Sequence, residues 1–360
     1  MYVWNQEQLR EGRYAETDIE RIIFGPNVSY IPENCFNGCN NLKEIVFEGN
    51  IDNIEAAAFM GCKNLNIVDF NIVNNVNIIE DFAFYGCNNI YNFNINEDVA
   101  ADIKYGKNND GLSTYFVLPE IGTPLNNIPW YKIDLISRKG KAKEYFKVGE
   151  EKEIIINNYN YEKYDFKTKG MILSTHPKTT YNVQILGFDH DYSKIGYDFT
   201  YFSKKNGITF GLKDQMVSTY NMNANNSNIK GWNTSEMRLY LKNKVFPSLS
   251  PDLQLVIKTT YKRTDCDQLN NIVKDKLFLF SSEEVGINLT SDYIQGQGTK
   301  YEFFSNNASR IKYRNGSKAD YWLRSILTSN TKSFYYINSN GIDNYQNSCI
   351  SNGIVFGFCI

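Results

Sequence analysis

The C-terminal stretch ADYWLRSILTSNTKSFYYINSNGIDNYQNSCISNGIVFGFCI, residues 319–360, is the segment that best indicates the fold of this chain. It begins with an aromatic and arginine-containing motif, residues 321–325, and ends with the apolar run Ile354–Ile360. Short apolar and aromatic runs of this length are typical of buried strands. Tyr, Asn and Ser crowd the segment between the two runs. We therefore expect two buried strands that flank an exposed polar and aromatic surface.

Charge is unevenly divided along the 360 residues, a length sufficient for two domains. Residues 1–138 contain 9 Lys and Arg against 19 Asp and Glu, a net charge of −10, whereas residues 139–360 contain 29 against 21, a net charge of +8. Such asymmetry indicates two domains that attract each other, or a second half that meets an acidic partner. The basic residues form no run, and no glycine-rich phosphate loop joins a strand to a helix. We expect neither a nucleic-acid partner nor a cofactor.

The seven cysteines, an odd number without a CxxC pair, indicate reduced thiols rather than a disulfide framework. Residues 1–14 contain no apolar segment of the kind found in signal peptides, and no window approaches the roughly 18 apolar residues of a membrane span. We expect a chain without a membrane span that is cytoplasmic, or associated with a cell surface or virion by a route that needs no cleaved signal. These features do not predict an oligomeric state.

A repeat occupies the first half of the chain. The segment IPENCFNGCNNLKEIVF, residues 31–47, recurs as IEAAAFMGCKNLNIVDF, residues 54–70, and as IEDFAFYGCNNIYNFNI, residues 79–95, at spacings of 23 and 25 residues. Each unit places a Phe in the core, a Gly at a tight turn, a Cys at a small core position and an aliphatic residue before a strand. Repeats of this length are typical of solenoids, in which a unit buries its apolar face only by stacking on its neighbours.

The repeated pattern A-F-x-G-C-x-x-L resembles the BspA-like leucine-rich repeats of bacterial surface and phage proteins over residues 18–97. The resemblance implies a short leucine-rich-type β-solenoid. We assign residues 1–138 to this domain, with a C-terminal cap that includes residues 128–131, and place the boundary at the charged segment 139–143. The cysteines that recur in register are expected to be structural, because thiols stacked one strand apart lack the tetrahedral arrangement that zinc requires.

The second half contains a series of motifs between residues 180 and 360: LGFDHD, ITFGL, GWNTSEMRLYL, DKLFLFSSEEV, YWLRS and GIVFGFCI. The third has the pattern of a helix with Thr234 or Ser235 as its N-cap. Together they resemble a family of bacterial and phage domains of unassigned chemistry. That family is similar in turn to the C-type-lectin-like fold shared with formylglycine-generating enzymes and with the receptor-binding proteins of diversity-generating retroelements. The resemblance implies an α+β chain, with a mixed α+β C-type-lectin-like domain over residues 139–360.

On this resemblance, four residues are structural anchors: Trp232, Arg238, Trp322 and Arg324. A buried indole needs a partner for its N–H, and the Arg324 guanidinium needs backbone carbonyls or a carboxylate, for which Asp320 and Glu284 are the candidates.

The resemblance places the ligand-binding surface between the two C-terminal strands, where Tyr offers contact area and Asn and Ser offer adaptable hydrogen bonds. The alternative is that these are solvated loop residues of an Asn-rich protein. The predicted binding residues are Ser329, Asn330, Thr331, Ser333, Tyr335, Asn338, Asn340, Asp343, Asn344, Tyr345 and Asn347.

Two other groups of residues are candidates for metal binding or catalysis. Asp189 and Asp191 flank His190 and are weak candidates for a metal site, but a turn with side-chain capping explains them as well. Cys349 and Cys359 stand near the C-terminus, where formylglycine-generating enzymes hold a copper ion through a cysteine pair. No feature of the sequence indicates that these two thiols converge.

We therefore predict a non-enzymatic recognition protein that binds a protein or glycan ligand through residues 327–352, a stretch that a retroelement would diversify. One alternative is a formylglycine-generating-type oxidase that uses Cys349 and Cys359. Another is a scaffold or assembly protein that docks basic surfaces on the acidic solenoid.

Overall fold

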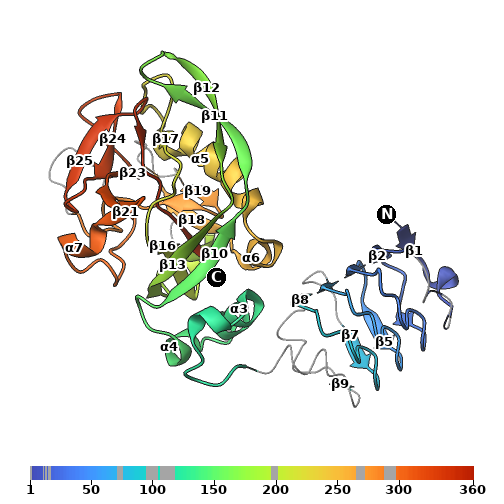
Figure 1. Ribbon diagram of the computed structural model, residues 1–360. Helices are drawn as coiled ribbons and strands as arrows, with labels where there is room; N and C mark the ends of the chain where they lie inside the picture. Colours follow the sequence, from blue (N-terminus) through green and yellow to red (C-terminus); the bar gives the residue numbers. More distant parts are fainter. Residues whose placement is uncertain are drawn as a thin grey trace. The chain divides into compact units, whose positions relative to one another are not determined.

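Figure 1 shows the computed structural model, which describes residues 2–10, 12, 14, 18–70, 76–94, 104–105, 118–195, 202–264, 272–287 and 297–360. The chain divides into two compact units, Met1–Pro119 and Glu120–Ile360. Within the described ranges, no helix has both the length and the apolar character needed to cross a membrane.

The first unit is a β-solenoid of two parallel sheets, as the repeats predicted (Figure 1). Each repeat contributes one strand to each sheet, and equivalent residues of successive repeats pair with one another. One sheet contains β1 (Tyr2–Trp4), β2 (Arg21–Phe24), β4 (Glu44–Phe47), β6 (Ile67–Asp69) and β8 (Asn92–Asn94), and the short helix η1 (Gln6–Gln8) follows β1. The other contains β3 (Tyr30–Ile31), β5 (Ile51–Ile54), β7 (Val76–Ile79) and β9 (Lys104–Tyr105).

Stacked phenylalanine rings join the repeats. Phe36, Phe59 and Phe84 are fully buried, and their ring centroids are 5.3 and 5.2 Å apart. Because the ring of one repeat stacks on the ring of the next, a single repeat has little core of its own. A second buried stack contains Phe24, Phe47, Phe70 and Phe93.

The recurring cysteines and glycines complete each repeat. The Cys62 thiol donates to the Phe36 carbonyl at 3.1 Å, and the Cys87 thiol donates to the Phe59 carbonyl at 2.9 Å. Gly61 has a φ of +73°, in the left-handed region where a Cβ adds strain. The thiols therefore act as hydrogen-bond donors inside the solenoid, and the glycine permits the turn.

The second unit consists mostly of strands, with few helices (Figure 1). Its strands are β10 (Glu151–Ile156), β11 (Tyr159–Asp165), β12 (Gly170–His176), β13 (Thr179–Phe188), β14 (Tyr192–Ile195), β15 (Phe202–Lys205), β16 (Ile208–Leu212), β17 (Tyr220–Asn221), β18 (Thr260–Arg263), β19 (Ile272–Asp275), β20 (Phe278–Leu279), β21 (Lys312–Arg314), β22 (Ser317–Ala319), β23 (Tyr321–Ile326), β24 (Ser333–Ile337), β25 (Asp343–Asn347), β26 (Ser351–Asn352) and β27 (Phe356–Cys359). Its helical segments are η2 (Leu125–Asn127), α3 (Trp130–Arg138), α4 (Ala142–Tyr145), η3 (Gly231–Thr234), α5 (Glu236–Tyr240), η4 (Leu241–Val245), η5 (Phe246–Ser248), α6 (Pro251–Val256) and α7 (Asn307–Arg310).

The main sheet of this unit is antiparallel, in the order β10–β13–β16–β27–β20, so the C-terminal strand lies in its interior. A separate three-stranded sheet has the order β23–β24–β25, and β11 and β12 form a two-stranded hairpin. Strand β27 is buried at every residue and β23 at every residue but the last. The two ends of the C-terminal stretch are thus buried strands, as their composition predicted.

The boundary between the units lies at residues 119/120. The sequence had suggested a boundary at 138/139. Helix α3, which we expected to cap the solenoid, packs within the second unit instead. The ring of Trp130 lies edge-on to Phe358 of β27, with centroids 6.0 Å apart, and the Lys152 ammonium of β10 donates to the Ile128 carbonyl at 2.7 Å. The expectation was wrong because a charged segment was interpreted as a linker, whereas the apolar side of α3 is needed to cover the main sheet.

Candidate functional site

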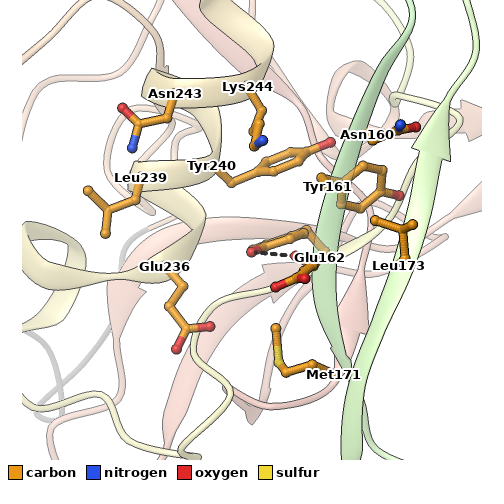
Figure 2. A pocket seen from close by; sticks show the side chains of 11 residues that line it. Asn160, Tyr161, Glu162, Met171, Leu173, Glu236, Leu239, Tyr240, Asn243 and Lys244 are labelled. Atoms are coloured by element: carbon orange, nitrogen blue, oxygen red, sulfur yellow. Dashed lines mark hydrogen bonds between the residues drawn. The ribbon is translucent and has the colours of Figure 1, made fainter.

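A pocket of about 520 Å³ lies between the hairpin β11–β12 and the helical segment formed by α5 and η4 (Figure 2). One wall comes from the hairpin, which lines the pocket with the side chains of one face and with Tyr161 of the other. Side chains alternate across a strand, so Asn160 and Glu162 of β11 lie on the same face as Met171 and Leu173 of β12. Met171 and Leu173 are 54% and 72% exposed. This wall therefore combines polar groups with two exposed aliphatic side chains.

Three tyrosines form the floor of the pocket. The rings of Tyr220 and Tyr240 are stacked with centroids 4.2 Å apart, and the Tyr161 ring lies 5.2 Å from that of Tyr240. The Tyr220 hydroxyl donates to the Glu162 carbonyl at 3.1 Å, the contact drawn in Figure 2, and the Tyr240 and Tyr159 hydroxyls share a hydrogen bond of 2.6 Å. These bonds fix the rings between the hairpin and the helix.

Two phenols of the floor, Tyr220 and Tyr240, have raised pKa values. Burial, and secondarily the negative charge of Glu236, raises the pKa of Tyr220 to about 12. Burial also raises the pKa of Tyr240 far above its usual range, and the neighbouring Tyr159 phenol adds to the shift. Tyr220 and Tyr240 therefore offer aromatic surface and hydrogen-bonding hydroxyls, and near pH 7 neither supplies a phenolate to act as a base or nucleophile.

The other wall comes from the helix that the GWNTSEMRLYL motif predicted. Ser235 is its N-cap, since the Ser235 hydroxyl accepts from the Arg238 N–H at 3.2 Å. After Tyr240 the helix continues as the π-helical turn η4, which contributes Asn243 and Lys244 to the pocket. Single π-helical turns are rare and are frequently found at functional sites.

Two of the predicted anchors hold this helix in place. The Trp232 indole N–H donates to the Asp275 carboxylate at 2.8 Å, and the Arg238 guanidinium pairs with the same carboxylate at 2.7 Å. Trp322, a third anchor, donates from its indole N–H to the Tyr220 carbonyl at 3.0 Å. The helical wall and the tyrosine floor are thus tied to residues that are themselves buried.

The fourth anchor, Arg324, belongs to a group of buried charges. Its guanidinium contacts both oxygens of Glu284 at 2.5 and 3.0 Å, and Glu284 also accepts from the Lys262 ammonium at 2.9 Å. Lys262 pairs in turn with Asp191, which accepts from the Tyr301 hydroxyl at 2.7 Å. Asp320, the other carboxylate considered for Arg324, accepts instead from the Ser339 N–H.

The cations of this group keep its carboxylates ionised. Burial alone would raise the pKa of Asp191, but the adjacent charge of Lys262 outweighs it, and the pKa lies well below its usual range. Burial likewise raises the pKa of Glu284, and the charges of Arg324 and Lys262 bring it below its ordinary value. Two cations and two anions therefore balance within the core, an arrangement that is costly to interrupt.

The suggested metal pair is not formed. Asp189 is exposed, has a φ of +53° and pairs with Lys143 at 3.2 Å, whereas Asp191 is buried and bound to Lys262. Over the described ranges of the chain, no group of three or more His, Cys, Asp or Glu side chains is arranged to hold a metal ion. A cavity of about 540 Å³ lies beside these residues and is bordered by Asp191, Lys262 and Glu284 as well as by His190 and Thr299.

The predicted binding surface is only partly exposed. Ser333 and Tyr335 are buried, at 2% and 6% exposed, because β24 is the middle strand of its sheet. The Asn330 side-chain oxygen accepts from the Ser333 N–H at 2.9 Å, and that of Asn338 accepts from the Asn340 N–H at 2.9 Å. These two amides therefore hydrogen-bond to the backbone of turns. This agrees with the alternative that they are loop residues and not ligand-binding residues.

The remaining predicted residues lie on β25 and in the adjoining loops. Tyr345, the largest of them, is 53% exposed. None of the eleven residues lines the pocket in Figure 2. The exposed or partly exposed members of the set are Ser329, Asn330, Thr331, Asn338, Asn340, Asp343, Asn344, Tyr345 and Asn347.

Cys349 and Cys359 occupy different parts of the second unit. Cys359 is in β27, and its Sγ lies 3.5 Å from a carboxylate oxygen of Asp191. Cys349 follows β25, outside the main sheet. Burial raises the pKa of both thiols, that of Cys359 to about 12, so both remain protonated near pH 7.

The hairpin, which contributes one wall of the pocket, was not predicted from the sequence. Part of its signal was present: aromatic and polar residues alternate over residues 159–162, and residues 166–169, FKTK, form a turn in which Lys169 has a φ of +51°. The pattern was missed because the alternation of β11 ends at Lys163, which lies on the same face as Tyr159 and Tyr161 and reduces its apolar contrast.

Comparison with known families separates the two units. Residues 7–107 match the BspA type leucine-rich repeat region, in six copies. The predicted repeat resemblance is therefore confirmed. Residues 206–360 match the Domain of unknown function (DUF6273), in agreement with the predicted family of unassigned chemistry. No curated protein matches the chain. The likeness to C-type lectins and formylglycine-generating enzymes receives no support from these matches and stays a prediction.

The pocket straddles one limit of the matched domain. Tyr220, α5 and η4 lie within residues 206–360, whereas the hairpin β11–β12 precedes them. Tyr220, Tyr240 and the helical wall therefore come from the matched residues, whereas Tyr161 and the hairpin wall come from a segment outside the match.

Proposed function

We propose that this chain is a non-enzymatic recognition protein whose second unit binds a segment of another protein in the tyrosine-floored pocket. Leucine-rich repeats themselves suggest a role in protein interaction. The observation that carries the proposal is the exposed aliphatic rim of the pocket. Met171, Leu173 and Leu239 are each about half exposed or more, although they surround a cavity with buried aromatic residues at its floor. Clustered exposed apolar side chains with a polar surround mark protein-interaction sites.

A protein segment fits this pocket better than a glycan does. Sugars stack on exposed aromatic faces, but Tyr161, Tyr220 and Tyr240 are each less than a tenth exposed, and two of their rings cover one another. The accessible part of the pocket is instead aliphatic, with Glu162 and Lys244 of opposite charge at its borders. A peptide supplies apolar side chains for the rim and backbone or charged groups for the borders.

Selection from a phage-displayed library of random peptides, about twelve residues long, against the full chain tests the proposal. Peptides that are recovered should bind the wild-type chain and lose about tenfold or more in affinity to the Leu173→Asp/Leu239→Asp variant, because a charge then replaces apolar contact area. Both residues are exposed, so the melting temperature should stay near that of the wild type.

Two controls of similar exposure accompany this measurement. Phe166→Asp changes a side chain that is 54% exposed at the tip of the hairpin, and Tyr345→Ala changes the surface on β25. Neither should alter peptide affinity. Loss of binding in Tyr345→Ala alone would return the site to the C-terminal surface. Binding on a glycan array that depends on Leu173 and Leu239, with no peptide recovered, would contradict a protein partner.

A further inference from the structure

The tyrosine-floored pocket is acidic at one end. Glu162 of β11 is exposed there, and Glu236, the first residue of α5, is half-buried. The Glu236 carboxylate accepts hydrogen bonds from the Ala224 N–H at 3.1 Å and from the Asn221 amide at 3.4 Å, and these hold it in place without a cation. Among the described residues, neither carboxylate forms an ion pair. Two negative charges at this end are thus available to a partner.

Both carboxylates lie close enough to the floor to act on Tyr220. Burial raises the pKa of the Tyr220 phenol to about 12, and the charges of Glu236 and Glu162 add to this shift. Glu162 also supplies the backbone carbonyl that accepts from the Tyr220 hydroxyl at 3.1 Å. The acidic end is therefore built by two elements, β11 and α5, that meet at one tyrosine.

The opposite end of the pocket carries a cation, the exposed Lys244 of η4. Glu236, Tyr240 and Lys244 follow one side of a continuous helical segment at intervals of four residues, and Figure 2 shows the two charged side chains on opposite sides of the Tyr240 ring. Helical ion pairs form between residues three or four apart, so Lys244 is too distant to neutralise Glu236. The aliphatic rim lies between these ends, with Leu239 on the helix and Leu173 across from Glu162 on the hairpin.

We propose that the partner segment carries a basic side chain for the acidic end and an acidic side chain for Lys244, with an aliphatic side chain between them. This inference rests on the proposed function and adds the charge pattern of the partner. Like charges at either end would repel, so the pocket selects against segments whose charges are all of one sign. Residues eight apart in a helix are separated by roughly 12 Å along its axis, which corresponds to about three or four residues of an extended segment.

The peptides recovered on the full chain supply the first readout. A basic residue should recur about three or four positions from an acidic residue, with an aliphatic residue between them. The variant Leu173→Ser/Leu239→Ser establishes that a peptide occupies the pocket, because it removes apolar contact area without adding a charge. Affinity for this variant should fall about tenfold or more.

A double-mutant cycle tests the pairing directly. Replacement of the peptide's basic residue by Gln should weaken binding to the wild-type chain about tenfold. Binding to Glu162→Gln/Glu236→Gln should weaken by no more than about twofold, because no charge remains to pair with the basic residue. Gln at position 236 keeps an oxygen that accepts from the Ala224 N–H, so the melting temperature should stay near that of the wild type.

Two control variants make the cycle specific. Lys244→Gln should couple to the peptide's acidic residue and leave the tenfold effect of the basic residue unchanged. Glu144→Gln removes an exposed carboxylate of α4, outside the pocket, and should couple to neither residue. Equal coupling in Glu144→Gln and in Glu162→Gln/Glu236→Gln would assign the effect to the net charge of the chain and overturn the pairing.

The outcomes separate this inference from the function on which it rests. Peptides that need Leu173 and Leu239 but contain no basic residue would overturn the charge pattern and leave the pocket as the binding site. The same holds for peptides whose basic residue shows no coupling to Glu162 and Glu236. If no recovered peptide depends on Leu173 and Leu239, the inference and the proposed function are both wrong.

Discussion

The two units of this protein bury different kinds of residue. The solenoid core is a series of like contacts, in which each Phe meets the equivalent Phe of the next repeat. The second unit encloses two cations and two anions among its strands, and its pocket joins residues that are as far apart in sequence as Asn160 and Lys244. Stability in the first unit is therefore distributed over neighbouring repeats, whereas the second depends on a few contacts between distant segments.

The units also differ in charge. Residues 1–119 contain 7 Lys and Arg against 17 Asp and Glu, a net charge of −10, and residues 120–360 contain 31 against 23, a net charge of +8. The shift of the boundary to residues 119/120 leaves both totals unchanged. The solenoid is therefore acidic and the second unit basic, so substitutions of charged residues in one unit leave the net charge of the other unchanged.

The largest expected effect comes from Glu284→Gln in the buried charge group. The change leaves Arg324 and Lys262 without one of their two carboxylates, and breaking a buried pair in this way costs about 3–5 kcal/mol. Chemical denaturation should show this loss in the transition of the second unit only. Glu151→Gln, which breaks an exposed pair with Lys213, should change stability by less than about 1 kcal/mol. Equal effects of the two variants would contradict the structural role of the group.

A smaller effect is expected from acid, through His176 at the base of the hairpin. His176 is fully buried between the Tyr159 ring and the Ser218 hydroxyl, and burial lowers its pKa to about 4. The unfolded state, with a His pKa near 6.5, then binds the proton more readily. Stability from this group is thus lost as the pH falls from about 6.5 to 4, by roughly 3 kcal/mol.

The pH dependence of unfolding in His176→Gln isolates this contribution. The variant has no imidazole to protonate, so the difference in free energy of unfolding between it and the wild type should change across this interval and stay level above pH 7. A difference that is flat from pH 4 to 8 would show that burial does not disfavour the imidazolium.

The smallest expected effect lies in the solenoid, at Gly61→Ala. A Cβ at a φ of +73° costs about 1–2 kcal/mol, and the nearest atom it would meet, at 3.9 Å, leaves space for it. Thermal unfolding followed by circular dichroism should place this loss in the first unit and leave the second unchanged. Gly170→Ala, at a position without positive φ, is the matched control and should have little effect. A shift in the second unit would indicate that the two units unfold together.

The sequence predicted the solenoid well because its contacts are local and periodic. Positions that recur at 23 to 25 residues meet in space, so a pattern of Phe, Gly and Cys is sufficient to identify core and turn positions. The helix with Ser235 as N-cap was predicted for a similar reason, because capping depends on residues within one turn. The buried strands β23 and β27 followed from short apolar runs.

What the sequence could not determine depends on which segments become neighbours. Asp320 and Glu284 were equal candidates for Arg324, and only the approach of residues 281–284 to β23 selects Glu284. Ser333 and Tyr335 have the composition of a binding surface, yet the middle position of β24 buries them. The repeats, the helix start and the buried strands were thus determined by the sequence alone, since short-range periodicity and capping decide them. The pocket and the buried charges were decided by tertiary structure, because the burial of a side chain depends on the strand that packs over it.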